Sequence, residues 1–357
     1  MRAATALEMQ GMTVETLGKV MYILGMESSC DETSAAVVEM GDGVRAIRSN
    51  IVASQIETHR LYGGVVPEIA SRAHIEAISN ITYQALEEAG ITASQLGAVA
   101  VTAFPGLIGA LLVGVNFAKS MAYSRGIPLV AVNHIHGHVA AAYLTHPELE
   151  PPFLALVVSG GHTSFYEVSS YTDFREIGGT RDDAAGEAFD KIGRVIGMPY
   201  PGGAALDKLA YEGDPKAIVL PSPALSGDTL DLSFSGIKTA ALNYLNGMAQ
   251  KGQEVNRADV AAAYTKRIVD AITKKADLAL TQTKTKTLVL AGGVAANSHL
   301  RAALEQLCKR RGVKLAMPER ALCGDNGAMI AAAGYFEAMR GNFASTSLNA
   351  SANDDGL

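Results

Sequence analysis

Hydrophobic and polar positions follow the same order in two separate segments of the chain. Residues 22–38 and 153–168 each contain an apolar run, a turn of small polar residues and a second run rich in β-forming residues. A strand, a turn and a second strand are therefore predicted in both places. Because the pattern recurs in each half of the chain, we expect a duplicated α/β architecture.

Further strands and helices alternate along the chain. Short apolar runs predict buried strands at 98–102, 128–132 and 287–290. Helices are predicted after these strands, and a last helix of small residues begins at Gly327. Strands that alternate with helices imply a parallel or mixed sheet. The apolar stretch 98–118 contains Pro105, Gly106 and Gly109, so we predict a strand, a turn and a helix there, with no membrane span.

Composition and charge narrow the class of protein. The chain has 357 residues, of which 48% are hydrophobic and 18% charged, enough for two domains or one large two-lobed domain. Its formal net charge is −6, but residues 265–320 hold 12 Lys/Arg and 4 Asp/Glu. That basic segment is either a contact for phosphates or a solvated helix end. Three cysteines without a CxxC pattern are typical of a reducing compartment.

A pair of histidines is the first candidate site. His134 and His138 are four residues apart at the start of a predicted helix, so their imidazoles share one face. The two histidines either bind a metal ion or are partly buried helix residues. A metal needs a third ligand, and Asp325 is the best placed by its local chemistry, because it follows a loop at a helix start. No Glu follows His134, so the HExxH pattern of zinc proteases is absent.

Three small-residue turns are candidates for binding a nucleotide. The turn between the first two strands carries Asp31 and Glu32, which suit a metal, a cationic group or an attacking nucleophile better than a bare phosphate. In Ser159-Gly160-Gly161, and again in Gly292-Gly293, paired glycines let backbone amides approach an anion. Each turn alone could be an ordinary polar hairpin. Three of them in one α/β chain favour a nucleotide.

Two further polar segments have an open interpretation. Residues 182–191 carry acids at helical spacing, and a carboxylate such as Asp190 could accept hydrogen bonds from ribose hydroxyls or belong to a solvated helix face. Residues 233–239 form a small polar loop that holds Lys238, and this loop could contact phosphates or cap a helix.

These motifs together resemble one family. Their order along the chain is similar to that of the TsaD family, whose bacterial members are tRNA threonylcarbamoyltransferase subunits. The resemblance covers about Met21 to Gly341 and rests on the following segments: 27–33, 63–68, 134–138, 159–163, 187–191, 233–238, 291–297 and 323–327. The first 20 residues depart from it.

The resemblance implies a fold, a reaction and a set of residues. The fold is α/β of the ASKHA group (actin, hexokinase and Hsp70), two-lobed with duplicated mixed sheets and a nucleotide cleft. The reaction moves a threonylcarbamoyl group from threonylcarbamoyl-AMP to N6 of adenosine 37 in tRNAs that read ANN codons, and releases AMP. The family's metal ligands correspond to His134, His138 and Asp325. Its substrate-binding residues correspond to Val157, Val158, Ser159, Gly160, Gly161, Asp190, Gly203, Asp207 and Asn297.

The same resemblance implies cofactors, partners and a domain plan. We expect one divalent metal per subunit, with Fe²⁺ the first candidate and Zn²⁺ the second. The expected partners are tRNA, TsaB and TsaE, with TsaC supplying the adenylate. No membrane partner is expected, and the expected location is cytoplasmic. From their place on the turn that is expected to face the cleft, we further hypothesise that Asp31 or Glu32 assists the incoming adenine amine. The expected plan is an extension (1–20, a start-site artefact or unstructured), a metal-bearing lobe (21–150), a nucleotide lobe (151–341) and a flexible tail (342–357). The last helix (325–341) would pack back toward the first lobe.

Three other functions fit parts of the pattern. A metallo-endopeptidase needs a water-activating Glu near the His pair, which the predicted helix does not provide. A small-molecule kinase of the same fold would use a carboxylate base and Mg²⁺, and would not need paired histidines. A non-catalytic partner subunit could share the fold and lack the metal, but His134, His138 and Asp325 are all present.

Overall fold

The computed structural model describes residues 20–221 and 228–353, which form two compact units. Unit 1 contains residues 20–58, 65–150 and 324–353 of the described chain, and unit 2 contains residues 59–64 and 151–323. The sequence assigns residues 324–341 to the second lobe, with the last helix packing back toward the first; in the structure they group with unit 1. The expected extension lies, apart from Val20, outside the described residues.

Unit 1 is built on a five-stranded mixed sheet of order β3-β2-β1-β4-β5. β1 runs antiparallel to β2 and parallel to β4. The strands are β1 (Met21–Glu27), β2 (Glu32–Gly41), β3 (Val44–Ser54), β4 (Leu96–Phe104) and β5 (Leu129–Asn133). The helices are α2 (Ile56–Arg60), α3 (Pro67–Glu88), α4 (Ile108–Arg125), α5 (His134–Thr145) and α11 (Gly327–Met339), with a 3-10 turn η1 (Ala93–Gln95).

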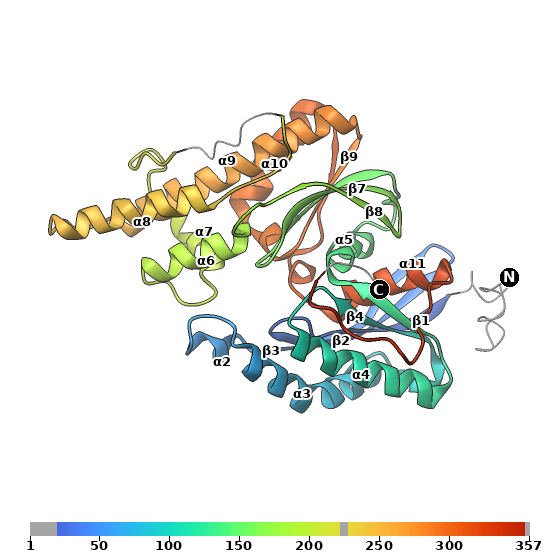
Figure 1. Ribbon diagram of the computed structural model, residues 1–357. Coiled ribbons are helices and arrows are strands. Elements are labelled where there is room, and N and C mark those ends of the chain that lie inside the picture. Colours follow the sequence, from blue (N-terminus) through green and yellow to red (C-terminus); the bar gives the residue numbers. More distant parts are fainter. Residues whose placement is uncertain (1–19, 222–227, 354–357) are drawn as a thin grey trace. The chain divides into compact units, whose positions relative to one another are not determined.

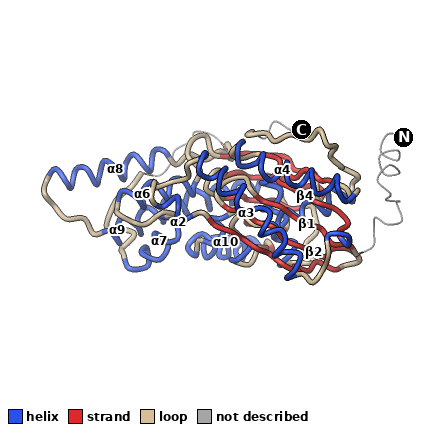
Figure 2. Tube along the Cα trace, turned by 90° about the horizontal axis from the view of Figure 1, so that it is seen from below, coloured by secondary structure: helices blue, strands red, loops and turns tan. Residues whose placement is uncertain are grey.

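Helices cover both faces of this sheet (Figure 1). On one face α3 and α4 lie over the strands, as Figure 2 shows from below. On the other face α11 contacts β1 and packs beside α5. Because side chains alternate along β1, Leu24 and Met26 enter the core with α3 and α4 while Gly25 faces α11. A Cβ on Gly25 would lie 2.1 Å from the carbonyl oxygen of Gly327, so this strand and helix meet backbone to backbone.

Unit 2 repeats the same sheet topology. Its order β10-β9-β6-β7-β8 has β6 antiparallel to β7 and parallel to β9, so β6 corresponds to β1. The strands are β6 (Phe153–Val158), β7 (Thr163–Ser170), β8 (Asp173–Gly179), β9 (Thr287–Ala291) and β10 (Lys314–Ala316). The helices are α6 (Ala185–Val195), α7 (Gly202–Leu209), α8 (Ser235–Gln250), α9 (Arg257–Thr283) and α10 (Ser298–Arg311), with 3-10 turns η2 (Ala210–Glu212), η3 (Gly293–Ala296) and η4 (Arg320–Leu322). Its core joins β6 and β9 to α6, α8, α9 and α10.

The predicted duplication of the sheets is confirmed. In each unit a strand hairpin leads into a parallel strand that follows a helical segment, which is what the repeated hydrophobic pattern predicted. The predicted buried strands are β4, β5 and β9.

The C-terminal segment differs from the flexible tail that its polar composition suggested. Leu348 is buried in the core of unit 1, and Lys119 donates a hydrogen bond to its carbonyl oxygen. The backbone amides of Ala344 and Ser351 bind the carbonyl oxygens of Leu129 and Ala103. Through residue 353, backbone pairing and one apolar anchor therefore hold a segment whose composition alone predicts disorder.

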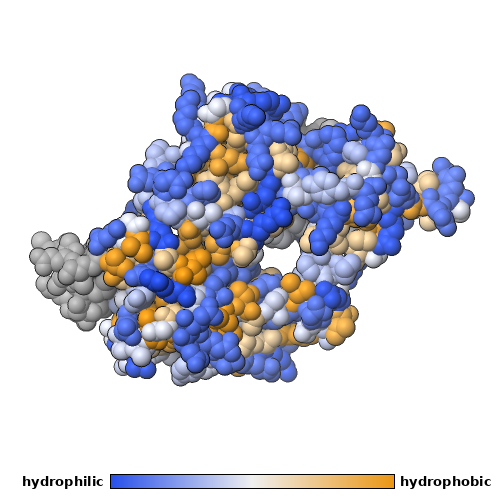
Figure 3. Space-filling view, turned by 180° about the vertical axis from the view of Figure 1, so that it is seen from behind, coloured by the Kyte–Doolittle hydropathy of each residue, from blue (hydrophilic) through white to orange (hydrophobic). Residues whose placement is uncertain are grey.

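Some large hydrophobic residues are exposed at the surface, among them Leu61, Tyr62 and Val219. On the face shown in Figure 3 hydrophobic residues appear in separate groups between hydrophilic residues. Within the described residues, no helix is long and apolar enough to cross a bilayer.

Candidate active site

The start of α5 positions the two histidines. β5 ends at Asn133, whose side-chain oxygen accepts hydrogen bonds from the amides of Ile135 (2.7 Å) and His136 (3.4 Å). This cap starts the helix directly at the end of the strand. His134 and His138 are then one turn apart, with their rings 4.6 Å from each other, and both are buried.

Asp325 completes a cluster of three potential metal ligands. It immediately precedes the cap of α11, and its Oδ1 lies 3.6 Å from Nε2 of His134 and 3.4 Å from Nε2 of His138. Ligand atoms of all three residues lie within 4.8 Å of one another. Two ligand atoms that each lie about 2.1 Å from the same ion are roughly 3.0–3.4 Å from each other. These side chains would therefore have to move only slightly closer together to hold a transition metal.

A buried carboxylate orients His134 toward this position. Glu27, at the end of β1, is fully buried, and its Oε2 lies 2.9 Å from Nδ1 of His134. The other bonds to Glu27 come from the Thr102 hydroxyl (2.7 Å) and the Ser29 amide (2.5 Å). A histidine whose Nδ1–H is held by a carboxylate presents Nε2 as a ligand, which is the usual support of a metal-binding imidazole. Nothing local in the sequence indicated this role; a Glu closing an apolar strand was the only signal.

The charges of this cluster are strongly coupled. Burial alone would raise the pKa of Glu27. The charge of His134 and the hydrogen bonds that Glu27 accepts outweigh burial and lower its pKa to about 2. Burial would lower the pKa of His134, but Asp325 and Glu27 raise it to about 9. Burial raises the pKa of Asp325 to about 6. In the absence of an ion the His134 imidazole therefore holds an extra proton at neutral pH, and a metal ion would displace it.

The turn that carries Asp31 and Glu32 adjoins the same cluster. Burial, followed by the charges of Asp325 and Asp31, raises the pKa of Glu32 to about 9. His74 of α3, which is fully buried, fixes the turn because its Nε2 lies 3.0 Å from the Cys30 carbonyl and its Nδ1 lies 2.7 Å from the Thr33 hydroxyl. Unit 1 thus brings both predicted acids to the predicted metal ligands.

Unit 2 contains the predicted nucleotide loops. Val157 and Val158 end β6, and Ser159 closes the following turn by accepting a hydrogen bond from the His162 amide (3.0 Å). Gly160 and Gly161 are exposed, and a Cβ on either would meet nothing within 4 Å. Their backbone is therefore open to a ligand.

The other predicted substrate residues of unit 2 form helix starts or bind to them. Asp190 of α6 accepts hydrogen bonds from the amides of Gly202 (2.7 Å) and Gly203 (3.1 Å), the first residues of α7. Asp207 of α7 accepts from the amide (3.1 Å) and hydroxyl (2.8 Å) of Ser298. Asn297 caps the same helix, α10, through the Leu300 amide. These residues hold α6, α7 and α10 together, which is a structural role that sequence analysis did not foresee.

The Ser233–Lys238 loop proves to be a helix start. Asp182 accepts hydrogen bonds from the hydroxyl and amide groups of Ser235 and from the Ser233 hydroxyl. Lys238 forms an ion pair with Asp183. Of the two interpretations left open by the sequence, helix capping is the one that these contacts support.

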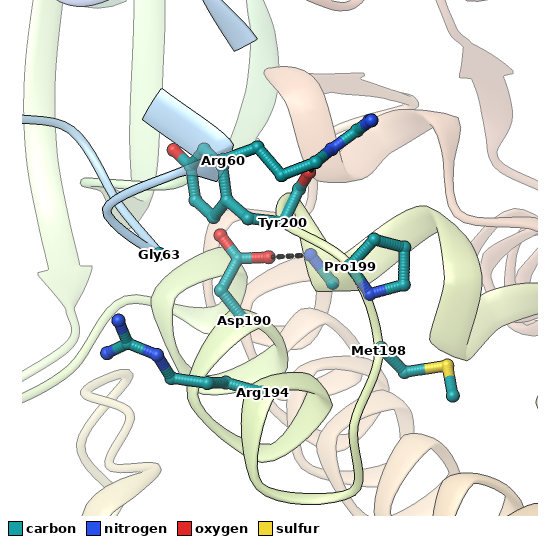
Figure 4. A pocket seen from close by; sticks show the side chains of 8 residues that line it. Arg60, Gly63, Asp190, Arg194, Met198, Pro199 and Tyr200 are labelled. Carbon is teal, nitrogen blue, oxygen red and sulfur yellow. Dashed lines mark hydrogen bonds between the residues drawn. The ribbon is translucent and has the colours of Figure 1, made fainter. Parts of the chain in front are cut away.

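A cavity of about 260 Å³ lies beside Asp190 (Figure 4). Arginines from two separate segments, apolar and aromatic side chains and one carboxylate share its lining: Arg60, Gly63, Asp190, Arg194, Met198, Pro199, Tyr200 and Gly202. Apart from Asp190, sequence analysis assigned these residues no individual role, because residues so distant in sequence meet only in the folded unit.

Comparison with known proteins identifies the family. A family profile described as tRNA N6-adenosine threonylcarbamoyltransferase, TsaD, matches residues 46–332. A protein of that name from Clostridium perfringens is 53% identical over 93% of this chain and 97% of its own length, and one from Clostridium botulinum is 52% identical over 92% and 96%.

Solved structures with low sequence identity show the fold. HypF of T. kodakarensis has a TM-score of 0.63 at 12% identity, covering 90% of this chain and 48% of its own. Component A of the (R)-2-hydroxyglutaryl-CoA dehydratase of Acidaminococcus fermentans has a TM-score of 0.53 at 16% identity, covering 89% and 99%. The predicted ASKHA fold is confirmed. With half its residues identical to curated relatives along almost their whole length, the chain belongs to the tRNA N6-adenosine threonylcarbamoyltransferase (TsaD) family.

Proposed function

We propose that this protein transfers the threonylcarbamoyl group of threonylcarbamoyl-AMP to N6 of adenosine 37 in tRNAs that read ANN codons. The amine attacks the carbamoyl carbon, a C–N bond forms, the C–O bond to the phosphate breaks, AMP leaves with the electron pair, and the amine loses a proton. The observation that carries the proposal, besides family membership, is the His134–His138–Asp325 cluster with Glu27 behind it.

The three ligands would hold one divalent metal ion, with Fe²⁺ as the first candidate and Zn²⁺ as the second. Two imidazoles and a carboxylate suit either ion. Bound there, the metal would supply a Lewis acid for the carbamoyl carbonyl or the phosphate. Glu27 keeps His134 in the ligating orientation, and α5 and α11 hold the ligands of their two segments together. The donor is already activated, so the transfer requires no covalent intermediate on the enzyme. The main task left to the enzyme is therefore to position the donor and the acceptor.

Asp31, or Glu32 in its ionised form, would accept the proton of the attacking amine. Both lie on the turn that His74 fixes beside the cluster, so either carboxylate could reach a reacting group held there. In unit 2, the Val157–Gly161 turn would face the adenylate through its open glycines. Asp190, Gly203, Asp207 and Asn297 would position the nucleoside while they hold the helix starts.

The proposal includes partners and a location. The family's acceptor is tRNA, and we propose TsaB and TsaE as partner subunits, TsaC as the source of the adenylate, and the cytoplasm as the compartment. The basic segment 265–320 would contribute to tRNA binding. Its densest cluster, residues 309–311, forms the last turn of α10, where Arg311 also pairs with Asp277 at 2.7 Å. Replacing Lys309 and Arg310 by Ala should weaken tRNA binding and flatten its salt dependence.

A single-turnover assay tests the function. The full chain, with its proposed partners, is mixed with labelled adenylate and unmodified tRNA, and both AMP release and label on adenosine 37 are followed. Transfer should require tRNA, and the His138→Ala variant should lose it. Peptide cleavage that a chelator abolishes would support the peptidase alternative, and phosphorylation of a small molecule with Mg²⁺ would support the kinase. Label that never reaches tRNA with the wild-type assembly would refute the proposal.

A further inference from the structure

The loop of residues 59–64 exposes an ordered aromatic and aliphatic tip. Leu61 is 83% exposed and Tyr62 is 55% exposed. The tip is held in a tight turn, because the amides of Tyr62 and Gly64 both bind the His59 carbonyl and the Gly63 amide binds the Arg60 carbonyl. Large apolar side chains held in place toward solvent are typical of a contact surface rather than of a simple connection.

Two arginines clamp this loop to the rest of unit 2. Arg194, near the end of α6, donates a hydrogen bond to the Tyr62 carbonyl at 3.1 Å. In return Arg60 donates through Nε to the Tyr200 carbonyl at 3.2 Å. Gly63 has a φ of +70°, which favours glycine, and a Cβ there would lie 2.0 Å from Nη2 of Arg194 and displace the guanidinium from its present position.

The cavity behind the loop combines positive charge with apolar walls. Arg60 and Arg194 contribute two positive charges, and in Figure 4 they lie on different sides of the Asp190 carboxylate. One oxygen of Asp190 is engaged by the first amides of α7, which partly offsets its charge. Met198 and Tyr200 add an apolar and an aromatic wall. A net positive cavity with such walls suits a phosphate joined to a planar ring, which is a nucleotide.

We propose that the 59–64 loop and Arg194 form an RNA contact. Arg60 and Arg194 bind a backbone phosphate at the cavity, and the ring of Tyr62 stacks on an unpaired base of the tRNA. The exposed tip favours RNA over the small adenylate, because a basic cavity next to an exposed aromatic ring is the arrangement with which proteins bind single-stranded nucleotides. The inference rests on the proposed function for its choice of tRNA as the ligand.

A set of variants in the full assembly tests this contact. Tyr62→Phe keeps a ring for stacking and Tyr62→Leu removes it; Arg60→Gln with Arg194→Gln removes both charges. The dissociation constant for unmodified tRNA is measured by fluorescence anisotropy over a salt series. The Michaelis constant for the adenylate is measured on the same samples. A matched control, Tyr123→Leu with Arg125→Gln, removes an exposed tyrosine and an exposed arginine from the end of α4.

The expected results separate the contribution of stacking from that of charge. Tyr62→Leu should weaken tRNA binding about tenfold while Tyr62→Phe stays close to the wild type. The double arginine variant should lower the slope of log K against log salt by about 0.7 for each phosphate that the arginines no longer neutralise. The control and the adenylate constant should stay unchanged.

Two results would overturn the contact. One is equal tRNA binding by the Leu and Phe variants with an unchanged salt slope in the double arginine variant. The other is a raised Michaelis constant for the adenylate with unchanged tRNA binding, which would assign the cavity to the donor nucleotide. Failure of the proposed function is seen separately, as absence of transfer by the wild-type assembly.

Discussion

Replacing Glu27 by Gln should weaken metal binding strongly without removing a metal ligand. The carboxylate has three partners: the Ser29 amide donates to Oε1, the Thr102 hydroxyl donates to Oε2, and Nδ1 of His134 also lies at Oε2. A Gln amide has only one acceptor oxygen. If its oxygen faces His134, its NH₂ group faces the Ser29 amide. If its NH₂ group faces His134, the imidazole must carry its proton on Nε2, the atom that would bind the metal.

The expected loss of metal affinity follows from the fact that neither orientation of the Gln amide satisfies all the partners of Glu27. One unsatisfied buried donor costs about 1–3 kcal/mol, and removing the partner of a ligating histidine typically costs about 10–100-fold in metal affinity. We therefore expect Glu27→Gln to raise the dissociation constant about 100-fold, or about 2.7 kcal/mol. Thr102→Val is the matched control, because it removes one hydroxyl donor from the Glu27 carboxylate and keeps that carboxylate on His134. Its effect on the dissociation constant for the metal should be about tenfold or less.

The assay is a competition titration on the full chain. Zn²⁺ is divided between the protein and a chromophoric chelator at pH 7, which avoids the oxidation of iron. Circular dichroism of each variant shows that the fold is retained. If Glu27→Gln bound Zn²⁺ within about twofold of the wild type, the carboxylate would not orient His134 and the reasoning would be wrong.

Three further predictions concern packing and the helix starts. Gly25→Ala should lower the free energy of unfolding by about 1–3 kcal/mol or more, measured by urea denaturation, because its Cβ meets the backbone of α11; Gly247→Ala, inside α8 with nothing within 4 Å of its Cβ, should raise it by about 0.5–1 kcal/mol. Leu348→Ala should cost about 2–5 kcal/mol in the same experiment, whereas a truly flexible tail would give no change. Asp190→Ala should lower stability by about 0.5–2 kcal/mol, and Asp190→Asn should restore it by capping α7; if both lower stability equally, Asp190 does not act as a cap.

Sequence patterns predicted the parts of the site whose chemistry is local. The i, i+4 spacing placed His134 and His138 on one face, and the loop before a helix start pointed to Asp325. Glu27 was not assigned to this cluster, because its partner is on another strand-helix junction and no local pattern links the two. The clamp between Arg194 and the 59–64 loop was missed for the same reason.

Local composition was misleading where tertiary contacts decide the structure. The small polar residues after 343 predict a flexible tail, yet backbone hydrogen bonds to β4 and β5 and the burial of Leu348 fix the segment. The duplication of the sheets, by contrast, was visible in the sequence because each strand pair is continuous in the chain. Patterns that repeat locally are therefore predictable, and contacts between distant segments are not.

The return of the chain to unit 1 has a consequence for biosynthesis. His134 and His138 leave the ribosome early, but Asp325 and α11 follow only after all of unit 2 has been made. A nascent or truncated chain therefore has two imidazoles and no carboxylate ligand from α11's start. Under the proposed function, loading of the ion would be deferred until translation is nearly finished, and prematurely terminated products would lack one of the three proposed ligands.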